Sequence, residues 1–141
     1  MKDSITILIV DDEYMVVNVL EKILMKKGFN VRTARNGQAA KEFLYSEPID
    51  VILSDIIMPD MDGFELLQYV KEIFPAVPVI MMTGKGDADM VRKATQLGAD
   101  EYITKPIKGD ELSLVIERIS WQLMAGENKS AKPGTGLKSG N

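Results

Sequence analysis

Four short apolar segments of this chain each end at a polar cluster that could take part in chemistry. The clusters are Asp11-Asp12, Asp55, Thr83-Gly84 and Lys105-Pro106. If the apolar segments are neighbouring parallel strands, their carboxyl ends meet at one edge of a sheet. Three carboxylates, a hydroxyl and an ammonium group would then lie together. Such a group of side chains suits a divalent cation and a phosphoryl group.

The three carboxylates are the reason to expect a cation. Asp11 and Asp12 alone would be interpreted as a helix cap and a solvated acidic turn. Asp55 at a second strand end changes this interpretation, because three neighbouring carboxylates repel one another unless a cation offsets their charge. Mg²⁺ binds oxygen ligands and keeps several of its waters, so it fits a site with few carboxylates.

Asp55 could also react directly. A carboxylate can attack phosphorus to form an acyl phosphate, while a metal ion and an ammonium group offset the charge of the transition state. Lys105 is the candidate for the ammonium group. Thr83 could donate its hydroxyl to a phosphoryl oxygen, and Gly84 leaves room for that group to approach.

The composition argues against several other kinds of site. The chain has 141 residues, no histidine and no cysteine, which excludes Ser-His-Asp and Cys-His catalysis, disulfides and thiolate metal sites. A net charge of −4 disfavours direct binding of nucleic acid, which depends on clustered Lys and Arg. No apolar segment reaches the length of a membrane span, and the first residues lack a secretory signal. We therefore expect one domain in the cytoplasm.

Five apolar segments alternate with five segments of helical period. The expected strands are Ile5–Val10, Asn30–Ala34, Asp50–Ser54, Pro78–Met82 and Glu101–Thr104. The expected helices are Asp12–Lys27, Asn36–Ser46, Gly63–Phe74, Asp87–Leu97 and a last helix from about Gly109 to Ala125. Several strands are apolar throughout, as in sheets that are covered on both faces. This order predicts an α/β domain of three layers, with right-handed crossovers.

The sequence changes character after the last helix. Residues 126–141 are rich in Gly, Ser, Lys and Asn, and Leu137 is their one large apolar residue. Such a segment buries too little apolar surface to order itself. We therefore expect a domain over residues 1–125 and a flexible or disordered tail over residues 126–141.

The last helix carries apolar residues on two faces. Leu112, Ile116 and Ile119 form the stripe expected to face the sheet. Leu114 and Trp121 lie roughly opposite that stripe at about 100° per residue. They are either isolated surface residues, which are common, or a contact surface for a partner or a second copy of the chain.

Four motifs of the chain, taken in order, resemble those of the receiver domains of two-component response regulators. They are Ile9-Val10-Asp11-Asp12-Glu13, Ser54-Asp55-Ile56-Ile57-Met58-Pro59-Asp60-Met61-Asp62-Gly63, Met82-Thr83-Gly84 and Glu101-Tyr102-Ile103-Thr104-Lys105-Pro106. The resemblance covers residues 6–123. It implies a flavodoxin-like (βα)5 sandwich with a five-stranded parallel sheet of order 2-1-3-4-5. It also implies a stand-alone regulator similar to chemotaxis regulators.

The resemblance implies how the acidic residues act. Asp55 would accept a phosphoryl group from a partner histidine kinase, a phosphotransfer protein or acetyl phosphate. Asp12 and Asp55 would bind Mg²⁺, or Mn²⁺ in its place. Asp11 would bind the metal through water, and Ile57 would supply its backbone carbonyl.

The resemblance also assigns the contacts of the phosphoryl group. Thr83, Gly84 and Lys105 would contact it, and the Lys105–Pro106 peptide bond would be cis. Thr83 and Tyr102 match the family's switch pair, in which the threonine moves toward the phosphoryl group and the aromatic ring turns inward. The surface that changes would be the fourth helix, the fifth strand and the last helix. This surface would bind a downstream protein target or form a homodimer.

Two other functions fit parts of the site. A Mg²⁺-dependent phosphatase could use Asp55 as its nucleophile, but phosphatases of the haloacid dehalogenase type need a second Asp two residues on, where this chain has Ile57. A flavodoxin-like binding module that is never phosphorylated would not need every acidic and basic residue of the site. We therefore predict a phosphorylation-activated signalling domain that is not an enzyme and binds neither nucleic acid nor membrane directly.

Overall fold

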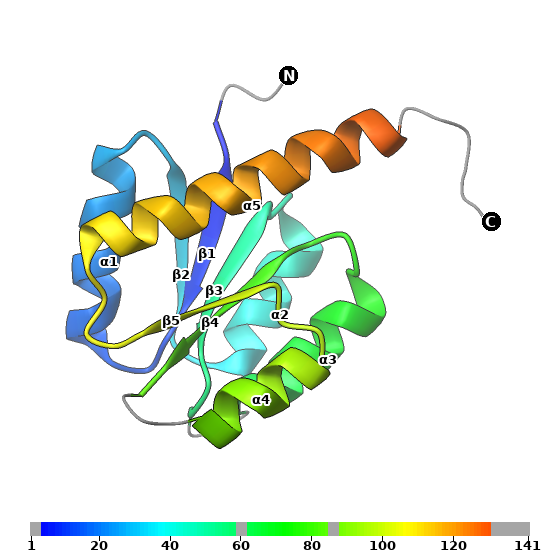
Figure 1. Cartoon of the computed structure of the whole chain (residues 1–141). Helices are drawn as coiled ribbons and strands as arrows, with labels where there is room; N and C mark the ends of the chain where they lie inside the picture. The colour runs from blue at the N-terminus through cyan, green and yellow to red at the C-terminus, as the bar shows by residue number, and fades with distance from the viewer. Residues whose placement is uncertain (1–3, 59–61, 85–87, 131–141) are drawn as a thin grey trace. The chain divides into compact units, whose positions relative to one another are not determined.

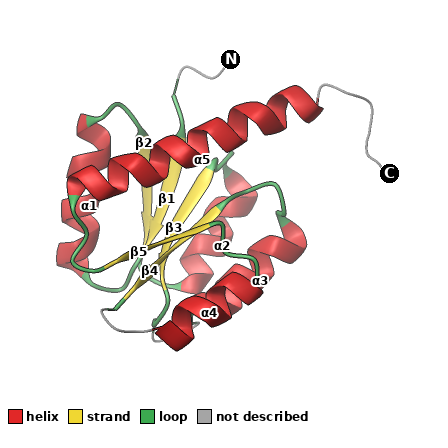
Figure 2. Cartoon of the chain, in the orientation of Figure 1, coloured by secondary structure: helices red, strands yellow, loops and turns green. Residues whose placement is uncertain are grey.

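The computed structural model describes residues 4–58, 62–84 and 88–130, in which strands and helices alternate (Figure 2). The elements are β1 (Thr6–Val10), α1 (Tyr14–Lys26), β2 (Asn30–Ala34), α2 (Gly37–Ser46), β3 (Val51–Asp55), α3 (Gly63–Ile73), β4 (Val79–Thr83), α4 (Ala88–Gln96), β5 (Glu101–Thr104) and α5 (Gly109–Ser130). Each predicted strand and helix is therefore present. Their ends lie within two residues of the predicted ends, except at the end of α5.

The five strands form one parallel sheet of order β2-β1-β3-β4-β5, as predicted (Figure 1). Val10 at the end of β1 pairs with Ala34 of β2 and with Ser54 of β3. Thr83 at the end of β4 pairs with Thr104 of β5. This register brings the carboxyl ends of the strands to one edge of the sheet. The fold is the flavodoxin-like α/β fold.

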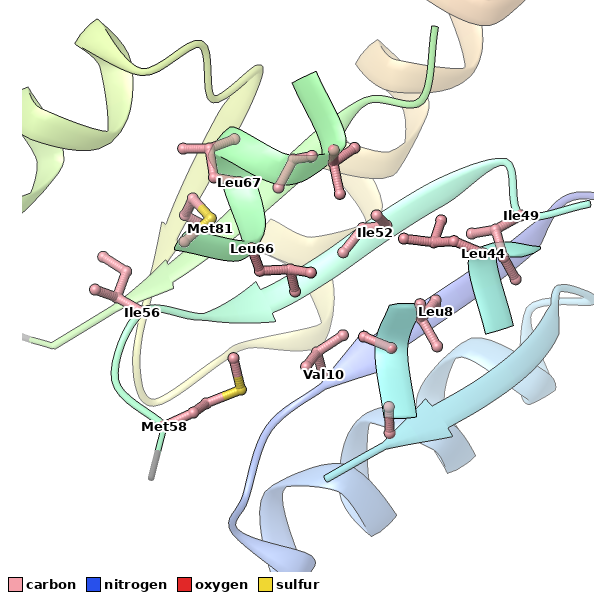
Figure 3. Close-up of a cluster of buried hydrophobic side chains, with 14 of the residues drawn as sticks. Leu8, Val10, Leu44, Ile49, Ile52, Ile56, Met58, Leu66, Leu67 and Met81 are labelled. Carbon is pink, nitrogen blue, oxygen red and sulfur yellow. The ribbon is translucent and has the colours of Figure 1, made fainter. Parts of the chain in front are cut away.

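Helices cover both faces of the sheet. Leu8 and Val10 of β1 belong to a buried apolar cluster with Leu44 of α2, Leu66 of α3 and Ala94 of α4, and most of these side chains meet in Figure 3. Because side chains alternate along a strand, the neighbours of Leu8 and Val10 in β1 point to the other face. Figure 1 shows α1 on that face. Burying a Leu or Ile side chain completely contributes about 1.5–3 kcal/mol to stability.

Residues 1–108 form one compact unit, and α5 belongs to a second unit. The helix continues beyond the predicted end at Ala125 to Ser130. Gly126 costs about 1 kcal/mol in a helix relative to alanine, but it does not end α5, and Glu127 and Lys129 beyond it are good helix formers. Residues 126–130 of the predicted tail are therefore helical, and residues 131–141 lie outside the described residues.

The length of α5 raises the question of a membrane span. It has 22 residues, but several of them are charged. Among the described residues, neither α5 nor another helix is both long and apolar enough to cross a membrane.

The start of α3 is fitted closely to the end of β3. The Asp62 side chain accepts a hydrogen bond from the Glu65 N–H at 2.9 Å, and the Glu65 side chain accepts one from the Asp62 N–H at 3.3 Å. This capping box satisfies two N–H groups at the start of the helix. The Gly63 N–H donates to the Ile56 carbonyl. A Cβ at Gly63 would overlap the backbone of Asp55 and Ile56, so only glycine lets α3 begin here.

We expect Gly63→Ala to lower the free energy of unfolding by about 1–3 kcal/mol, because the backbone beside Asp55 must shift to admit the methyl group. Gly109→Ala is the matched control, since no atom lies within 4 Å of a Cβ built there. Alanine favours helix more than glycine does, so this control should be as stable as the parent chain or slightly more stable. Urea denaturation followed by circular dichroism measures both variants. Equal stability of Gly63→Ala and the parent would contradict the prediction.

Candidate functional site

The candidate site lies where β1, β3, β4 and β5 end. Asp11 and Asp12 follow β1, Asp55 ends β3, Thr83 ends β4 and Lys105 follows β5. The Lys105 N–H donates a hydrogen bond of 2.8 Å to the Thr83 backbone carbonyl, which extends the sheet pairing to the lysine. The parallel sheet therefore brings together residues that are far apart in the sequence.

The carboxylates of Asp11, Asp12 and Asp55 converge. One oxygen of each lies within 4.8 Å of the chosen oxygens of the other two. The Asp11 side chain is fully buried, and only 14% of the Asp55 side chain is exposed. Carboxylates this close together repel one another, and burial weakens the screening by water. The group therefore needs positive charge nearby.

Lys105 supplies part of that positive charge. Its Nζ lies 3.0 Å from Asp11 Oδ2, 3.2 Å from Asp55 Oδ2 and 3.3 Å from Glu13 Oε1. Partial burial lowers the pKa of Lys105, but the contacts with Asp11 and Asp55 outweigh burial and hold the pKa above its usual value. Lys105 is therefore charged at neutral pH, and one ammonium group faces several carboxylates.

The charge of Asp55 remains incompletely offset. Burial raises the pKa of Asp55, and the neighbouring Asp11 carboxylate raises it further. Lys105 lowers this pKa, as does the Ile56 N–H, which donates to Asp55 Oδ1 at 2.8 Å. The net effect is a raised pKa, which means that the folded protein disfavours the charged form of Asp55.

The donor set fits a hard divalent cation. Asp11 Oδ1 accepts a hydrogen bond from the Glu13 N–H at 3.0 Å. Asp11 Oδ2 is buried 3.0 Å from the Lys105 ammonium, and it accepts no regular hydrogen bond from the described part of the chain. Leaving a buried carboxylate oxygen unsatisfied costs free energy. Together with Asp12 and Asp55, it offers the oxygen ligands that suit Mg²⁺ or Mn²⁺.

An open cleft of about 350 Å³ gives access to the carboxylates. Its walls come from the ends of β1, β3, β4 and β5 and from α4. The lining residues are Asp12, Glu13, Asp55, Ile56, Ile57, Met82, Gly84, Met90 and Lys105. All four polar clusters singled out in the sequence lie at or beside this cleft. It has room for a phosphoryl group and its waters.

The remaining predicted site residues lie at different depths. Gly84 and Ile57 line the cleft, and 63% of Ile57 is exposed. Thr83 is buried at the end of β4 and is not among the residues that line the cleft. Tyr102 of β5 is 48% exposed and also lies outside the cleft lining. Of these residues, the structure therefore places Gly84 and Ile57 in the cleft that opens onto the carboxylates.

The peptide bond between Lys105 and Pro106 is cis, as the resemblance implied. Some predicted features lie outside the described residues. These are Pro59, Asp60 and Met61 of the second motif and Asp87, the expected first residue of the fourth helix.

Glu13 lies in the site, although no sequence pattern gave it a role. Its carboxylate contacts Lys105, and its backbone N–H holds Asp11. The available signal was its position directly after the paired aspartates in the first motif. What the sequence could not show is that Glu13 turns toward a lysine that lies 92 residues further along the chain.

Comparison with known proteins agrees with this geometry. Residues 7–117 match the model of the response regulator receiver domain. The chain belongs to the response regulator receiver domain family. It is therefore a signalling module rather than an enzyme.

Curated relatives carry such a domain as one part of a longer protein. The receiver is 43% identical to the DNA-binding transcriptional regulator NtrC of Proteus hauseri over 110 residues, which cover 78% of this chain and 23% of the relative. It is 40% identical to the response regulator protein PilR of Pseudomonas aeruginosa over 100 residues, which cover 71% of this chain and 22% of PilR. The chain thus spans about a quarter of the length of the curated relatives it matches.

The similar solved structures include chains of about the length of this one and a longer chain of which this domain is one part. A putative response regulator from Chloroflexus aurantiacus has a TM-score of 0.80 and 31% identity, covering 83% of this chain and 98% of that one. NtrX from Brucella abortus has a TM-score of 0.87 and 30% identity, covering 96% of this chain and 31% of that one. The chemotaxis response regulator CheY4 of Vibrio cholerae has a TM-score of 0.77 and 27% identity, covering 82% of this chain and 98% of that one.

The family match and the convergence of three carboxylates agree on the kind of site. The cluster of Asp11, Asp12 and Asp55 is an acidic triad typical of the Mg²⁺ site of receivers, and it is consistent with a response regulator that accepts a phosphoryl group. Receiver domains work with histidine kinases.

Removing the charge of Asp55 should stabilise the metal-free receiver. Because folding raises the pKa of Asp55, the folded state binds its proton more tightly than the unfolded state, and stability is lost as pH rises through the raised pKa. That loss is absent from Asp55→Asn. At pH 7 in EDTA we therefore expect the variant to melt at a higher temperature than the parent.

Mg²⁺ should reverse the order of the two proteins. A concentration of about 100 times the Kd stabilises a folded protein by about 2.7 kcal/mol, and Asp55→Asn lacks one of the ligands. Differential scanning fluorimetry in EDTA and in Mg²⁺ measures both effects. A lower melting temperature of Asp55→Asn in EDTA, or an equal Mg²⁺ response of the two proteins, would contradict this account.

Proposed function

We propose that this receiver is activated when Asp55 accepts a phosphoryl group from a histidine kinase or a phosphotransfer protein in a Mg²⁺-dependent reaction. The observation that carries the proposal is the convergence of Asp11, Asp12 and Asp55 beside Lys105 under an open cleft. The charge that these groups leave unbalanced is the charge that a cation and a phosphoryl group would satisfy together.

Asp55 is placed to act as the nucleophile. Its Oδ1 is held by the Ile56 N–H and its Oδ2 by Lys105, which orients the carboxylate at the base of the cleft. A carboxylate oxygen attacks phosphorus and forms an acyl phosphate. The bond from phosphorus to the donor nitrogen breaks, and its electron pair stays on the donor imidazole. Lys105 would then contact a phosphoryl oxygen and offset its charge.

Four groups would hold the metal ion. Asp12 and Asp55 would bind it directly, Asp11 through water, and Ile57 through its backbone carbonyl. Mg²⁺ or Mn²⁺ would supply a Lewis acid that offsets the charge of the transferring phosphoryl group. The buried, unsatisfied Oδ2 of Asp11 supports this ligand set.

The response would begin at Thr83. This residue is buried at the end of β4, directly before Gly84 of the cleft. A phosphoryl group on Asp55 would attract the Thr83 hydroxyl, and the space that it leaves would admit the ring of Tyr102, which is now half exposed. The switch would change the surface of α4 and β5, which would bind a downstream protein target. We place this signalling in the cytoplasm, without direct contact to nucleic acid or membrane.

The phosphodonor protein would dock in a groove next to the cleft. This groove of about 260 Å³ is mainly apolar and is lined by Met15, Val16, Val19, Leu20, Lys105, Pro106 and Ile107. Met15 and Val19 lie one turn apart on α1 and are 76% and 52% exposed. Because Lys105 lines both the groove and the cleft, an apolar helix in the groove would hold its phosphohistidine near Asp55.

Phosphorylation is tested by intact-mass analysis after incubation with acetyl phosphate. We expect one added phosphoryl group on the parent in Mg²⁺, little in EDTA, and none on Asp55→Asn. The adduct should be labile to base, as an acyl phosphate is. Phosphorylation of Asp55→Asn to the same extent as the parent would disprove the proposed acceptor.

The docking groove is tested by phosphotransfer from a purified histidine kinase that phosphorylates the parent. A charge in the apolar groove would have to be desolvated, so Met15→Glu and Val19→Glu should each slow transfer by about tenfold or more. Met25→Glu is the matched control, because Met25 is 58% exposed on the same helix but outside the groove. All three variants should react with acetyl phosphate at the parent rate. Unchanged transfer to Met15→Glu and Val19→Glu would place the docking site elsewhere, without affecting the assignment of Asp55.

A further inference from the structure

Arg35 is an exposed residue beside the acidic site to which the proposed phosphorylation gives no role. It follows β2 directly and precedes Asn36, which caps α2. Its guanidinium group donates a hydrogen bond of 3.3 Å to the backbone carbonyl of Asp12. The central carbon of the same group lies 5.3 Å from the centre of the Tyr14 ring. One cationic side chain therefore contacts the residues on both sides of Glu13.

The path of the chain places Arg35 next to the loop between β1 and α1. The Asp11 N–H donates a hydrogen bond of 3.1 Å to the Ala34 carbonyl, which continues the pairing of β1 with β2. The Asn36 side chain accepts a hydrogen bond of 2.8 Å from a backbone N–H of α2 and fixes the start of that helix. Because Arg35 lies between these two fixed points, its side chain begins at a defined place beside Asp12.

The Tyr14 ring restricts the guanidinium group. An exposed hydrogen bond is weak when its donor is long and free to leave, because water competes for both partners. A guanidinium group stacks on an aromatic face through cation–π attraction, which limits that freedom. Tyr14 is the first residue of α1 and is 59% exposed, so this stack lies at the surface and not in the core. The pair therefore acts on the loop between β1 and α1.

Asp12 depends on such support more than Asp11 does. Asp11 is fully buried, and its Oδ1 accepts a hydrogen bond from the Glu13 N–H. Asp12 is only partly buried and lines the open cleft. At the start of α1, within the part of the chain that the structure describes, the Glu13 side chain makes no capping hydrogen bond. The contact of Arg35 with the Asp12 carbonyl therefore restrains a loop that the helix start itself holds less firmly.

We propose that Arg35, held by Tyr14, is a positioning residue that fixes Asp12 as a ligand of the divalent cation. The inference rests on the proposed role of Asp12 in the metal site. A ligand whose backbone is fixed beforehand loses less freedom on binding, so the affinity for the metal rises. Groups that hold the ligands of a metal commonly affect its affinity in this way.

The charge of Arg35 by itself acts in the opposite direction. A guanidinium group near the site repels a cation, although water and salt weaken this effect at the surface. Removing an arginine that served only as a surface charge would therefore leave the affinity for Mg²⁺ unchanged or increase it. Removing a positioning arginine lowers the affinity. The direction of the change distinguishes the two roles.

Isothermal titration calorimetry of the full chain with Mg²⁺ tests the proposal. Arg35→Ala should raise the Kd for Mg²⁺ by about three- to tenfold. Arg92→Ala is the matched control, because Arg92 is also exposed but pairs with Asp89 on its own helix and is not among the residues that line the cleft. This control loses the same charge and should not raise the Kd. Circular dichroism checks that each variant is folded. A Kd of Arg35→Ala equal to or below that of the parent would overturn the proposal.

Substitutions of Tyr14 test the stack. Tyr14→Ala should raise the Kd for Mg²⁺, but by less than Arg35→Ala does. Tyr14→Phe keeps the aromatic ring and should bind Mg²⁺ with the parent affinity. The double variant Arg35→Ala/Tyr14→Ala should bind no more weakly than Arg35→Ala, because the ring acts only through the arginine. Additive effects of the two alanine substitutions would show that Tyr14 does not act through Arg35, and would overturn their pairing.

Phosphorylation by acetyl phosphate separates metal affinity from the chemical step. Intact-mass analysis at several Mg²⁺ concentrations should show that Arg35→Ala needs about three- to tenfold more Mg²⁺ for half of its maximal rate. Saturating Mg²⁺ should bring the rate close to that of the parent. A lower maximal rate with an unchanged requirement for Mg²⁺ would overturn the positioning role. A parent chain that binds no Mg²⁺ would overturn the proposed metal site as well, whereas equal Mg²⁺ binding by the parent and Arg35→Ala would overturn this inference alone.

Discussion

The excess of negative charge at the carboxyl edge of the sheet is the constraint on which the site depends. Three aspartates and Glu13 surround one ammonium group, and two of the carboxylates are buried or nearly so. This excess charge destabilises the folded protein. It is reflected in the raised pKa of Asp55 and in a buried oxygen of Asp11 that accepts no regular hydrogen bond from the described residues. Removing one partner from a buried group of charges destabilises the protein, because a charge is left uncompensated. A bound cation would instead offset the negative charge that remains. The site is therefore ready for positive charge before a ligand arrives.

The rest of the domain is built to hold that unfavourable group together. Parallel strands with apolar residues on both faces form a rigid sheet, and their ends hold the acidic side chains in place. Close packing at Gly63 holds the start of α3 against the backbone of Asp55 and Ile56 at the end of β3. Proteins commonly give up some stability at a functional site and recover it in the surrounding core. Here the recovery comes from the apolar cluster between the sheet and α2, α3 and α4.

Exposed apolar side chains on α1 lie beside the site. They line a groove together with Lys105 and Pro106, so a protein bound there would be next to Asp55. Apolar area alone gives little selectivity, and the charges around such a groove select the partner.

The sequence by itself determined the order of the strands and helices, the acidic residues and the family, because these depend on local periodicity, on turn formers and on motifs that are read in order. It placed the end of α5 too early, since composition alone does not show how far a helix continues through Glu127 and Lys129. Only the tertiary structure decided that Glu13 reaches Lys105 and that one Asp11 oxygen is left unsatisfied. Such contacts join residues as many as 92 positions apart. They are set by the path of the whole chain, which no local pattern records.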